Sequence, residues 1–368
     1  MGWSNMLPEV LDVIARKHIV FYEDYHSFAG VCKSWHTVAL KAAKEVAKGN
    51  GAPSRLPSLM LSEETKDKKC REIYLLSNKT IREIRLPQVY GKLCMSSCGW
   101  LLTVANDHSS QLINPLSREI FELPKVDTFP RSDIKIWYDS IKKLLFIAEL
   151  SLVVVVWGYQ EKLGYCRIGD NKWTPVDNAG STIMDITYYN RQVYIFDFHF
   201  AVKVWDVHGE DPTKIVVLHS HVPADFYADD AEDLRIAYIL GLDDGERKRL
   251  LVVSRKGVID QDEDDYETNF LRVWDFDLED REWSKVSDLG NKTLFVGHSS
   301  SFWIEDTTGV IKGNCIYFTD DVVEAYRESQ YGGGEDMGTY DLSDESIARH
   351  FTGESHSHLT PPIWLQSM

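Results

Sequence analysis

From residue 57 to its end, the chain is a recurrence of short β-type segments, and this recurrence limits the possible folds more than any other feature. An apolar segment is followed by one that contains aromatic residues, and the pair recurs every roughly fifty to seventy residues. The apolar members are 144–149, 193–198, 250–254 and 314–318, and the aromatic members are 153–157, 202–206, 271–275 and 338–341. Turn-forming clusters such as Gly169-Asp170-Asn171 lie between them. This spacing predicts a β-propeller of about six blades with loop insertions.

The C-terminal stretch "PPIWLQ", residues 361–366, supplies one more apolar strand. We expect it to close the ring against the first blade, which would leave no open edge between the two ends of the chain. A pair of β-sandwiches is the alternative architecture, because the order in which strands pair cannot be read from their spacing.

The first 48 residues have helical patterns instead. "SNMLPEVLDVIARK" offers a polar cap at Ser4 or Asn5 and a proline, Pro8, early in a helix. "YEDYHSFAGVC" and "KSWHTVALKAAKEVAK" predict a second and a third helix, and "GNGAPS" reads as a linker. The sequence therefore predicts a mainly β protein with a small α domain, divided into a helical domain (1–48), a linker (49–56) and a propeller (57–368). A three-helix unit of this size cannot bury all its apolar groups, so a partner surface is expected.

Charge is distributed unevenly. The chain of 368 residues has a formal net charge of −17, and its first 50 residues contain six Lys/Arg and five Asp/Glu. That balance of +1 leaves −18 on the remainder, so the acidity belongs to the predicted propeller. We expect no nucleic-acid partner, because phosphate binding needs a basic face.

The six cysteines are scattered, and their spacing suits neither a disulfide scaffold nor a zinc knuckle. No signal peptide is visible, and the longest apolar run, "LVVVVW", is too short to span a bilayer. We expect a soluble protein with reduced thiols in the nucleus or the cytoplasm, without a membrane partner.

Two short motifs suggest known repeats. Trp205-Asp206 and Trp274-Asp275 are WD dipeptides, but Gly297-His298 follows them instead of preceding each one. Tryptophans near strand ends that fill blade cores are the expected structure. Gly332-Gly333-Gly334 resembles a kelch diglycine once, and a flexible hairpin tip is expected there.

"DQDEDDYETNFL", residues 260–271, spaces its acids as a calcium loop would. Its sixth position is Asp265 in place of Gly and its twelfth is Leu271 in place of Glu, so the calcium ligands are incomplete. We expect a solvated hairpin tip without a metal. A basic partner is a possible ligand for its acids Asp260, Asp262, Asp264 and Asp265, and the acids of 224–233 have the same status.

No P-loop, GxSxG elbow or HExxH motif is present, so the sequence predicts no catalytic residue, cofactor or metal. A propeller enzyme acting on a sugar or small metabolite is the rival function. It would place convergent buried carboxylates with raised pKa values in the central channel.

"LPEVLDVIARKHIVFYEDYHSFAGVCKSWHTVA", residues 7–39, resembles an F-box, the helical module that docks onto a Skp-type adaptor of a cullin ubiquitin ligase. The residues that match its pattern are Leu7, Pro8, Leu11, Ile14, Asp24, Phe28, Val31, Cys32, Lys33 and Trp35. The resemblance implies that the adaptor is bound by Leu7, Pro8, Leu11, Ile14, Phe28, Val31, Cys32 and Trp35. Leu7, Pro8 and the group around Val31 and Trp35 would pack into the adaptor, since a lone helical unit leaves such residues half exposed.

The rest of the chain resembles the β-propeller of a plant family of F-box proteins, the KIB-type group. The segments that carry the resemblance are "SCGWLLTV", "INPLSREIFELP", "YILGLDDGERKRLLVVSR", "LFVGHSSSF" and "GNCIYFTDD", in this order. The resemblance implies a non-catalytic substrate receptor that links a target protein to the adaptor and, through it, to a cullin. A non-degradative F-box scaffold is the alternative within the same family. The acidic insert at 260–267 is longer than the family pattern suggests.

Overall fold

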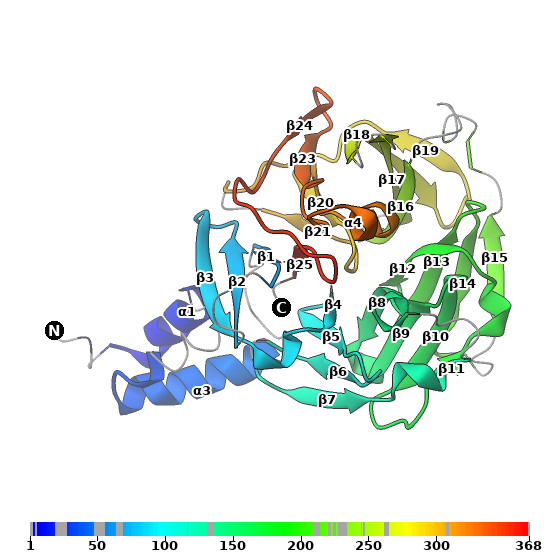
Figure 1. The fold of residues 1–368 in the computed structure, drawn as a ribbon. Helices are drawn as coiled ribbons and strands as arrows, with labels where there is room; N and C mark the ends of the chain where they lie inside the picture. The colour runs from blue at the N-terminus through cyan, green and yellow to red at the C-terminus, as the bar shows by residue number, and fades with distance from the viewer. Residues whose placement is uncertain are drawn as a thin grey trace.

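The computed structural model describes residues 3, 6–18, 28–47, 56–63, 69–115, 117–130, 136–209, 214–219, 222–223, 226, 234–243, 245, 247–260, 265–306 and 309–366. Six sheets stand around a common centre in this part of the chain (Figure 1). The predicted mainly β propeller is confirmed, with six blades, and the paired β-sandwiches are excluded.

Each blade is a separate sheet, and in blades 2 to 5 the strands follow one another in chain order from the centre outward. Blade 1 contains β25 (Ile363–Leu365), β1 (Ser58–Met60), β2 (Cys70–Leu75) and β3 (Thr80–Arg85). Blade 2 contains β4 (Leu93–Ser97), β5 (Trp100–Val104), β6 (Ser110–Ile113) and β7 (Ile120–Leu123). Blade 3 contains β8 (Ile141–Ile147), β9 (Leu152–Trp157), β10 (Lys162–Arg167) and β11 (Thr174–Pro175).

The second half of the ring consists of blades 4, 5 and 6, and blade 5 has the longest strands. Blade 4 contains β12 (Ile183–Tyr189), β13 (Gln192–Asp197), β14 (Val202–Trp205) and β15 (Ile215–His219). Blade 5 contains β16 (Leu234–Asp243), β17 (Lys248–Asp260), β18 (Asp265–Asp277) and β19 (Trp283–Val286). Blade 6 contains β21 (Phe302–Glu305), β20 (Lys292–Val296), β22 (Cys315–Phe318), β23 (Gly338–Asp341) and β24 (Ser346–Ala348).

The apolar strands are buried on both faces because each blade is packed between two others. β9 shows this most clearly, since all six of its residues are buried. Val153, Val155 and Trp157 face the core shared with blade 2, and Leu152, Val154 and Val156 face the core shared with blade 4. This is the period of two of a β-strand, with an apolar neighbour on each side.

The ring closes where the two ends of the propeller sequence pair. β25 runs antiparallel to β1, with Ser58 opposite Leu365 and Met60 opposite Ile363. Trp364 is buried, and its indole Nε1 donates to the Val296 carbonyl of blade 6 at 3.2 Å. The expected closure by the C-terminal strand is confirmed.

Blade 6 departs from a simple meander. β20 pairs in parallel with β22, and β21 pairs antiparallel with the inner edge of β20. The chain therefore turns back toward the centre after β20 before it continues outward, and β21 takes the innermost position of the blade. Spacing along the sequence did not predict this order.

The tryptophans and glycines of the suspected repeats have clear places. Trp205 and Trp274 are buried in cores between blades, as predicted. The expectation of a flexible hairpin tip at Gly332-Gly333-Gly334 is wrong. All three glycines are buried, Gly333 forms a bridge with Ser357, and the Gly334 amide donates to Asp320 Oδ2 at 2.7 Å. A Cβ on Gly334 would lie 2.0 Å from the Ser355 carbonyl oxygen, so the chain needs glycine here for close approach.

The N-terminal helices lie outside the ring of blades (Figure 1). α1 (Pro8–His18) and α3 (Lys33–Ala47) agree with the first and third predicted helices, and Pro8 opens α1. The second predicted helix and the linker lie mostly outside the described residues. A short α4 (Val323–Glu328) lies near the centre of the ring. None of the described helices combines the length and hydropathy that a bilayer-spanning helix needs.

Candidate functional site

α1 and α3 are joined by a small apolar core of their own. Leu11 and Ala15 of α1 pack with Phe28 and with Trp35 of α3, and the described core residues are Leu11, Ala15, Phe28, Trp35, Val38, Ala39 and Ala42. The Phe28 and Trp35 rings lie 4.4 Å apart between centroids, and the Trp35 indole donates to the Trp3 carbonyl at 3.1 Å. Trp35 therefore belongs to the core of this helical unit.

A row of apolar side chains remains on the outside. Leu7, Val10 and Val13 are spaced three residues apart, so they follow one side of the first helical turns. Leu7 is 66% exposed and Val13 is 50% exposed. Val31, two residues before the start of α3, is 52% exposed. We call Leu7, Val10, Val13 and Val31 the exposed apolar set. Side chains of this kind on so small a unit indicate contact with another molecule.

Of the residues that were predicted to bind the adaptor, some are exposed and others are buried. Leu7, Pro8 and Val31 are exposed, and Ile14 and Cys32 are half-buried. Leu11, Phe28 and Trp35 are buried, and Trp35 is only 9% exposed. The expectation that Trp35 is left half exposed is therefore wrong, because Phe28 and Leu11 cover it. Val10 and Val13 were missed, although their exposure on α1 follows from helical periodicity once Leu11 and Ala15 are known to face inward.

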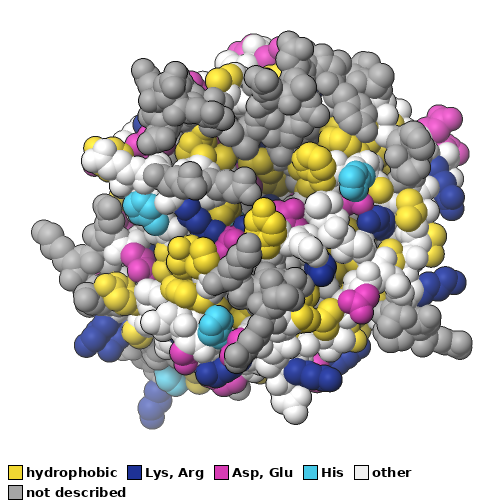
Figure 2. Space-filling view, turned by 45° about the vertical axis from the view of Figure 1, so that its right-hand side comes forward, with side chains coloured by type: hydrophobic (Ala, Val, Ile, Leu, Met, Phe, Trp, Pro, Cys, Tyr) yellow, Lys and Arg dark blue, Asp and Glu magenta, His cyan; other side chains and the backbone are white. Residues whose placement is uncertain are grey.

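The acidic segment does form a hairpin. β17 and β18 pair as far as Asp260 opposite Asp265. Asp262 and Asp264 lie outside the described residues, as does nearly all of 224–233. Binding of a basic partner by Asp260, Asp262, Asp264 and Asp265 therefore stays a prediction. On the face in Figure 2, Lys and Arg side chains are scattered among acidic and apolar ones.

The centre of the propeller contains a buried polar network. The Lys143 ammonium of β8 donates to the Gly297 carbonyl at 2.7 Å and lies 3.8 Å from Asp321 and 4.0 Å from Asp185. Asp185 also accepts hydrogen bonds from the Ile239 amide and the Ser301 hydroxyl, each at 2.9 Å. Burial raises the pKa of Asp185, while these partners act in the opposite direction. The network ties blades 3, 4, 5 and 6 together.

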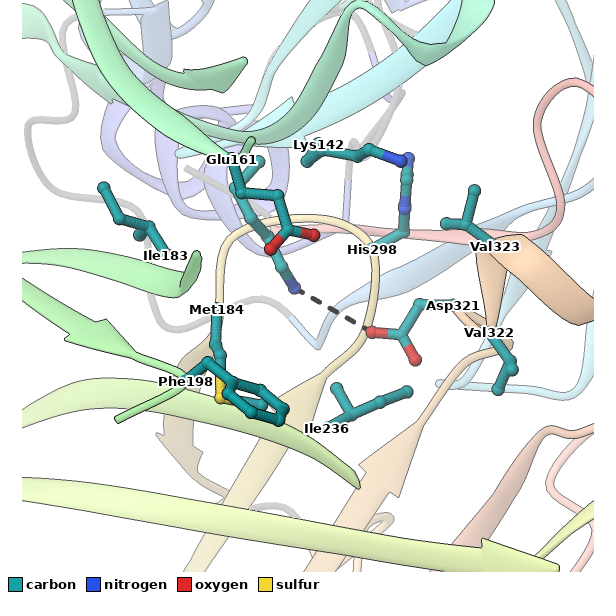
Figure 3. Close-up of a pocket in the computed structure, with 11 residues that line it drawn as sticks. Lys142, Glu161, Ile183, Met184, Phe198, Ile236, His298, Asp321, Val322 and Val323 are labelled. Carbon is teal, nitrogen blue, oxygen red and sulfur yellow. Dashed lines mark ion pairs between the residues drawn. The ribbon is translucent and has the colours of Figure 1, made fainter. Parts of the chain in front are cut away.

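Beside this network, a pocket of about 330 Å³ lies near the centre of the ring where β8 and β12 begin, and Figure 3 shows the side chains that line it. Its polar lining consists of Lys142, Lys143, Glu161, His298 and Asp321, and its apolar lining consists of Ile183, Met184, Phe198, Ile236, Val322 and Val323. A smaller pocket of about 220 Å³ lies at the other end of the same inner strands, beside Phe146, Tyr188 and Trp303. The volume of the larger pocket is within the usual range of small-molecule sites.

The buried carboxylates Asp185 and Asp320, near the centre of the ring, form hydrogen bonds that hold the propeller together. Burial raises the pKa of Asp320 to about 6, and Asp320 accepts hydrogen bonds from the Tyr266 hydroxyl and the Gly334 amide. Neither Asp185 nor Asp320 lines the larger pocket. The raised pKa values expected for a propeller enzyme are present, but these two groups use their oxygens within the protein. Among the described residues no cluster of three or more His, Cys, Asp or Glu could hold a metal ion.

The comparison with protein families is decisive for the propeller. The family described as KIB1-4 beta-propeller matches residues 73–341, which is more than half of the chain. The chain belongs to the KIB1-4 β-propeller family. The resemblance drawn from the segments between "SCGWLLTV" and "GNCIYFTDD" is confirmed.

Relatives of this KIB1-4 β-propeller protein are found in Arabidopsis thaliana. At5g55150, named for an F-box, is 25% identical over 339 residues, covering 87% of this chain and 85% of the relative. F-box protein At2g05970 is 21% identical over 360 residues, covering 86% of this chain and 85% of the relative. F-box/kelch-repeat protein KIB1 is 24% identical over 283 residues, covering 72% and 65%. The relatives therefore carry the name of an F-box together with this propeller.

Proposed function

We propose that this protein is the substrate-receptor subunit of a Skp–cullin–F-box ubiquitin ligase. The observation that carries the proposal is the exposed apolar set on an N-terminal helical unit whose sequence resembles an F-box. The names of the relatives support it. The adaptor would cover Leu7, Pro8 and Val31, while Leu11, Phe28 and Trp35 would hold the two helices in the shape that the adaptor recognises.

The ligase chemistry would not take place on this chain. The propeller would hold a target protein, and the complex would bring a target lysine close to the ubiquitin-loaded conjugating enzyme. Such catalysis works by raised effective concentration and needs no nucleophile here. None of the six cysteines, all of which lie in the described part of the chain, forms a disulfide, which suits a receptor in a reducing compartment, the nucleus or the cytoplasm. The acidity of the propeller sequence favours targets with basic surfaces.

The test is a calorimetric titration of a purified Skp-type adaptor against the intact chain and against Leu7→Asp/Val31→Asp. Each of these exposed side chains is expected to behave as a hot spot of about 2 kcal/mol, so the double variant should lose about 4 kcal/mol and bind on the order of 1000-fold more weakly. Val217→Asp is the matched control, since Val217 is 53% exposed on β15 of the propeller. The control should bind as the intact chain does.

Both exposed variants should keep the circular dichroism and thermal midpoint of the intact chain, because no buried group changes. Trp35→Ala would be a poor probe, since it removes a core residue and would lose binding through unfolding alone. An intact chain that does not bind the adaptor would contradict the proposal. A target whose abundance does not change when this protein is removed would instead favour a non-degradative scaffold.

A further inference from the structure

The larger of the two pockets contains one buried polar atom that the described part of the chain leaves unsatisfied. His298 follows β20 and is 2% exposed, and its Nε2 has no hydrogen-bond partner in the part of the chain that the structure describes. Its side chain lines the pocket. The large majority of buried side-chain polar atoms in native proteins are paired, so an unpaired one that faces a pocket calls for a ligand group.

The other polar groups of the pocket are already engaged. Lys143 donates to the Gly297 carbonyl and pairs with Asp321. Asp321 also accepts from Arg255 at 2.8 Å and from the Tyr238 hydroxyl at 2.9 Å. Lys142 pairs with Asp139 outside the pocket lining. His298 is therefore the group whose pairing a ligand would complete.

The surroundings of His298 favour an anionic group. In Figure 3 the end of the Lys142 side chain lies next to the His298 ring. Burial and the nearby cations Lys143, Arg327 and Lys142 hold the pKa of His298 well below its ordinary value, so the imidazole is neutral and one ring nitrogen donates a proton. With two lysines against Glu161 and Asp321 the lining is formally neutral, so the positive charge that favours an anion is the local one of Lys142 near His298, and the higher charge of a phosphate is disfavoured.

The opposite side of the pocket is apolar. Met184, Phe198 and Ile236 lie together across from Lys142 and His298, while Val322 and Val323 lie at the side of the pocket where Asp321 is (Figure 3). At a water's share of about 30 Å³, the pocket has room for a ligand of about a dozen non-hydrogen atoms. The ligand would therefore place a polar head at His298 and an apolar body against Met184 and Phe198.

We propose that this pocket binds a small monocarboxylic acid with an apolar body, whose carboxylate accepts a hydrogen bond from His298 Nε2 and lies beside the Lys142 ammonium. The site is separate from the N-terminal helices and does not depend on adaptor binding. It gives the propeller a small-molecule site in addition to its protein-binding role.

The experiment titrates the full chain with phenylacetate, 3-phenylpropionate, 4-phenylbutyrate and 5-phenylvalerate. Calorimetry measures the affinity of each acid. In methyl-labelled protein, a shift of the Met184 methyl resonance shows that the acid binds in this pocket, and the loss of this resonance in Met184→Leu assigns it. The neutral 4-phenylbutyramide has the same size as 4-phenylbutyrate and tests the carboxylate. The test variants are His298→Phe, Lys142→Gln and Phe198→Ser, and Phe198 is the exposed residue at the rim of the pocket. The control is Lys172→Gln, because Lys172 is an exposed lysine outside the pocket lining.

At least one of the acids should bind and shift the Met184 resonance, and 4-phenylbutyramide should bind roughly tenfold more weakly than 4-phenylbutyrate, the factor expected for a charge-assisted hydrogen bond. His298→Phe and Lys142→Gln should lose about the same factor for the acid. Phe198→Ser should weaken the binding of acid and amide alike, and Lys172→Gln should change the binding of neither.

Absence of binding by all four acids at millimolar concentration would overturn the proposal. Equal binding of acid and amide would also overturn it, as would binding that survives both Phe198→Ser and Lys142→Gln.

Discussion

At the scale of single residues, Arg255 joins blades 5 and 6. Its guanidinium is buried and lies 2.8 Å from Asp321 and 2.7 Å from Asp336, both of blade 6. It also donates to the Thr268 hydroxyl at 2.7 Å and to the Thr319 carbonyl at 2.8 Å. All three guanidinium nitrogens are thereby paired, which is the condition under which a buried ion pair supports a fold.

Replacing Arg255 with methionine should therefore destabilise the propeller strongly. Asp336 would stay buried without its cation and Asp321 would keep only the Lys143 cation at 3.8 Å, so we expect a loss of about 3–5 kcal/mol in the free energy of unfolding. Chemical denaturation measures this. Arg247→Met is the matched control, because Arg247 is exposed and lies 3.7 Å from Asp277, and it should cost less than about 1 kcal/mol. Similar losses in both variants would contradict the role given to Arg255.

Asp320 gives a prediction about pH. Its pKa is about 6 in the folded protein and its ordinary value is 3.8, so between these values the folded state holds a proton that the unfolded state has lost. The contribution of Asp320 is thus fully present below about pH 4 and is lost as the pH rises through 6. In Asp320→Asn, the fall in unfolding free energy from pH 4 to pH 7 should be smaller by roughly 2–3 kcal/mol. Denaturant titrations at several pH values measure the free energy of unfolding. If its dependence on pH is the same in Asp320→Asn as in the intact chain, Asp320 does not cause the effect.

At the scale of elements, the ring depends on β25. This strand has three residues, yet it contributes Trp364, whose ring lies 5.0 Å from that of Phe295 in blade 6. The same strand supplies the inner partner of β1. The C-terminal end of the chain therefore contacts the blades on both sides of the closure.

Trp364→Ala should open this closure. The cavity alone costs about 3–5 kcal/mol, and blades 1 and 6 would lose their shared contact. Amide hydrogen exchange should increase first in β1, β20 and β25, and less in β9 and β13 on the far side of the ring. Ile120→Ala, an exposed position on the outer strand β7, is the control and should leave exchange unchanged. Uniformly faster exchange around the ring would mean that the closure is not a local weak point.

At the scale of the whole molecule, the helical unit and the propeller have separate cores. The described residues of the N-terminal core fall within Met6–Ala42, and each of the six propeller cores consists of residues from Leu56 onward. This separation suits a protein in which one part docks and another part selects a target.

Removing residues 1–55 should therefore leave the propeller folded. We expect the β-sheet circular dichroism to persist and the thermal midpoint to change by no more than about 2 °C, since no core between blades loses a residue. Adaptor binding should disappear completely. A shift of about ten degrees or more would show that the helices are part of the propeller's stability.

Much of this architecture was readable from the sequence. Short apolar and aromatic segments between turn-forming clusters predicted the strands, their recurrence predicted about six blades, and Pro8 and the apolar spacing predicted α1 and α3. "PPIWLQ" predicted the closing strand. These features follow from local geometry, because a residue's place in a strand or a helix fixes the direction of its side chain.

Only the tertiary structure decided the rest. It paired β20 with β22 in parallel, buried Gly332-Gly333-Gly334, placed Trp35 inside the helical unit and left Val10 and Val13 outside. It also brought Lys143, His298 and Asp321, which are far apart in the sequence, to one pocket. Burial and pairing depend on which distant segments lie alongside, and that is a property of the packed chain that no local pattern contains.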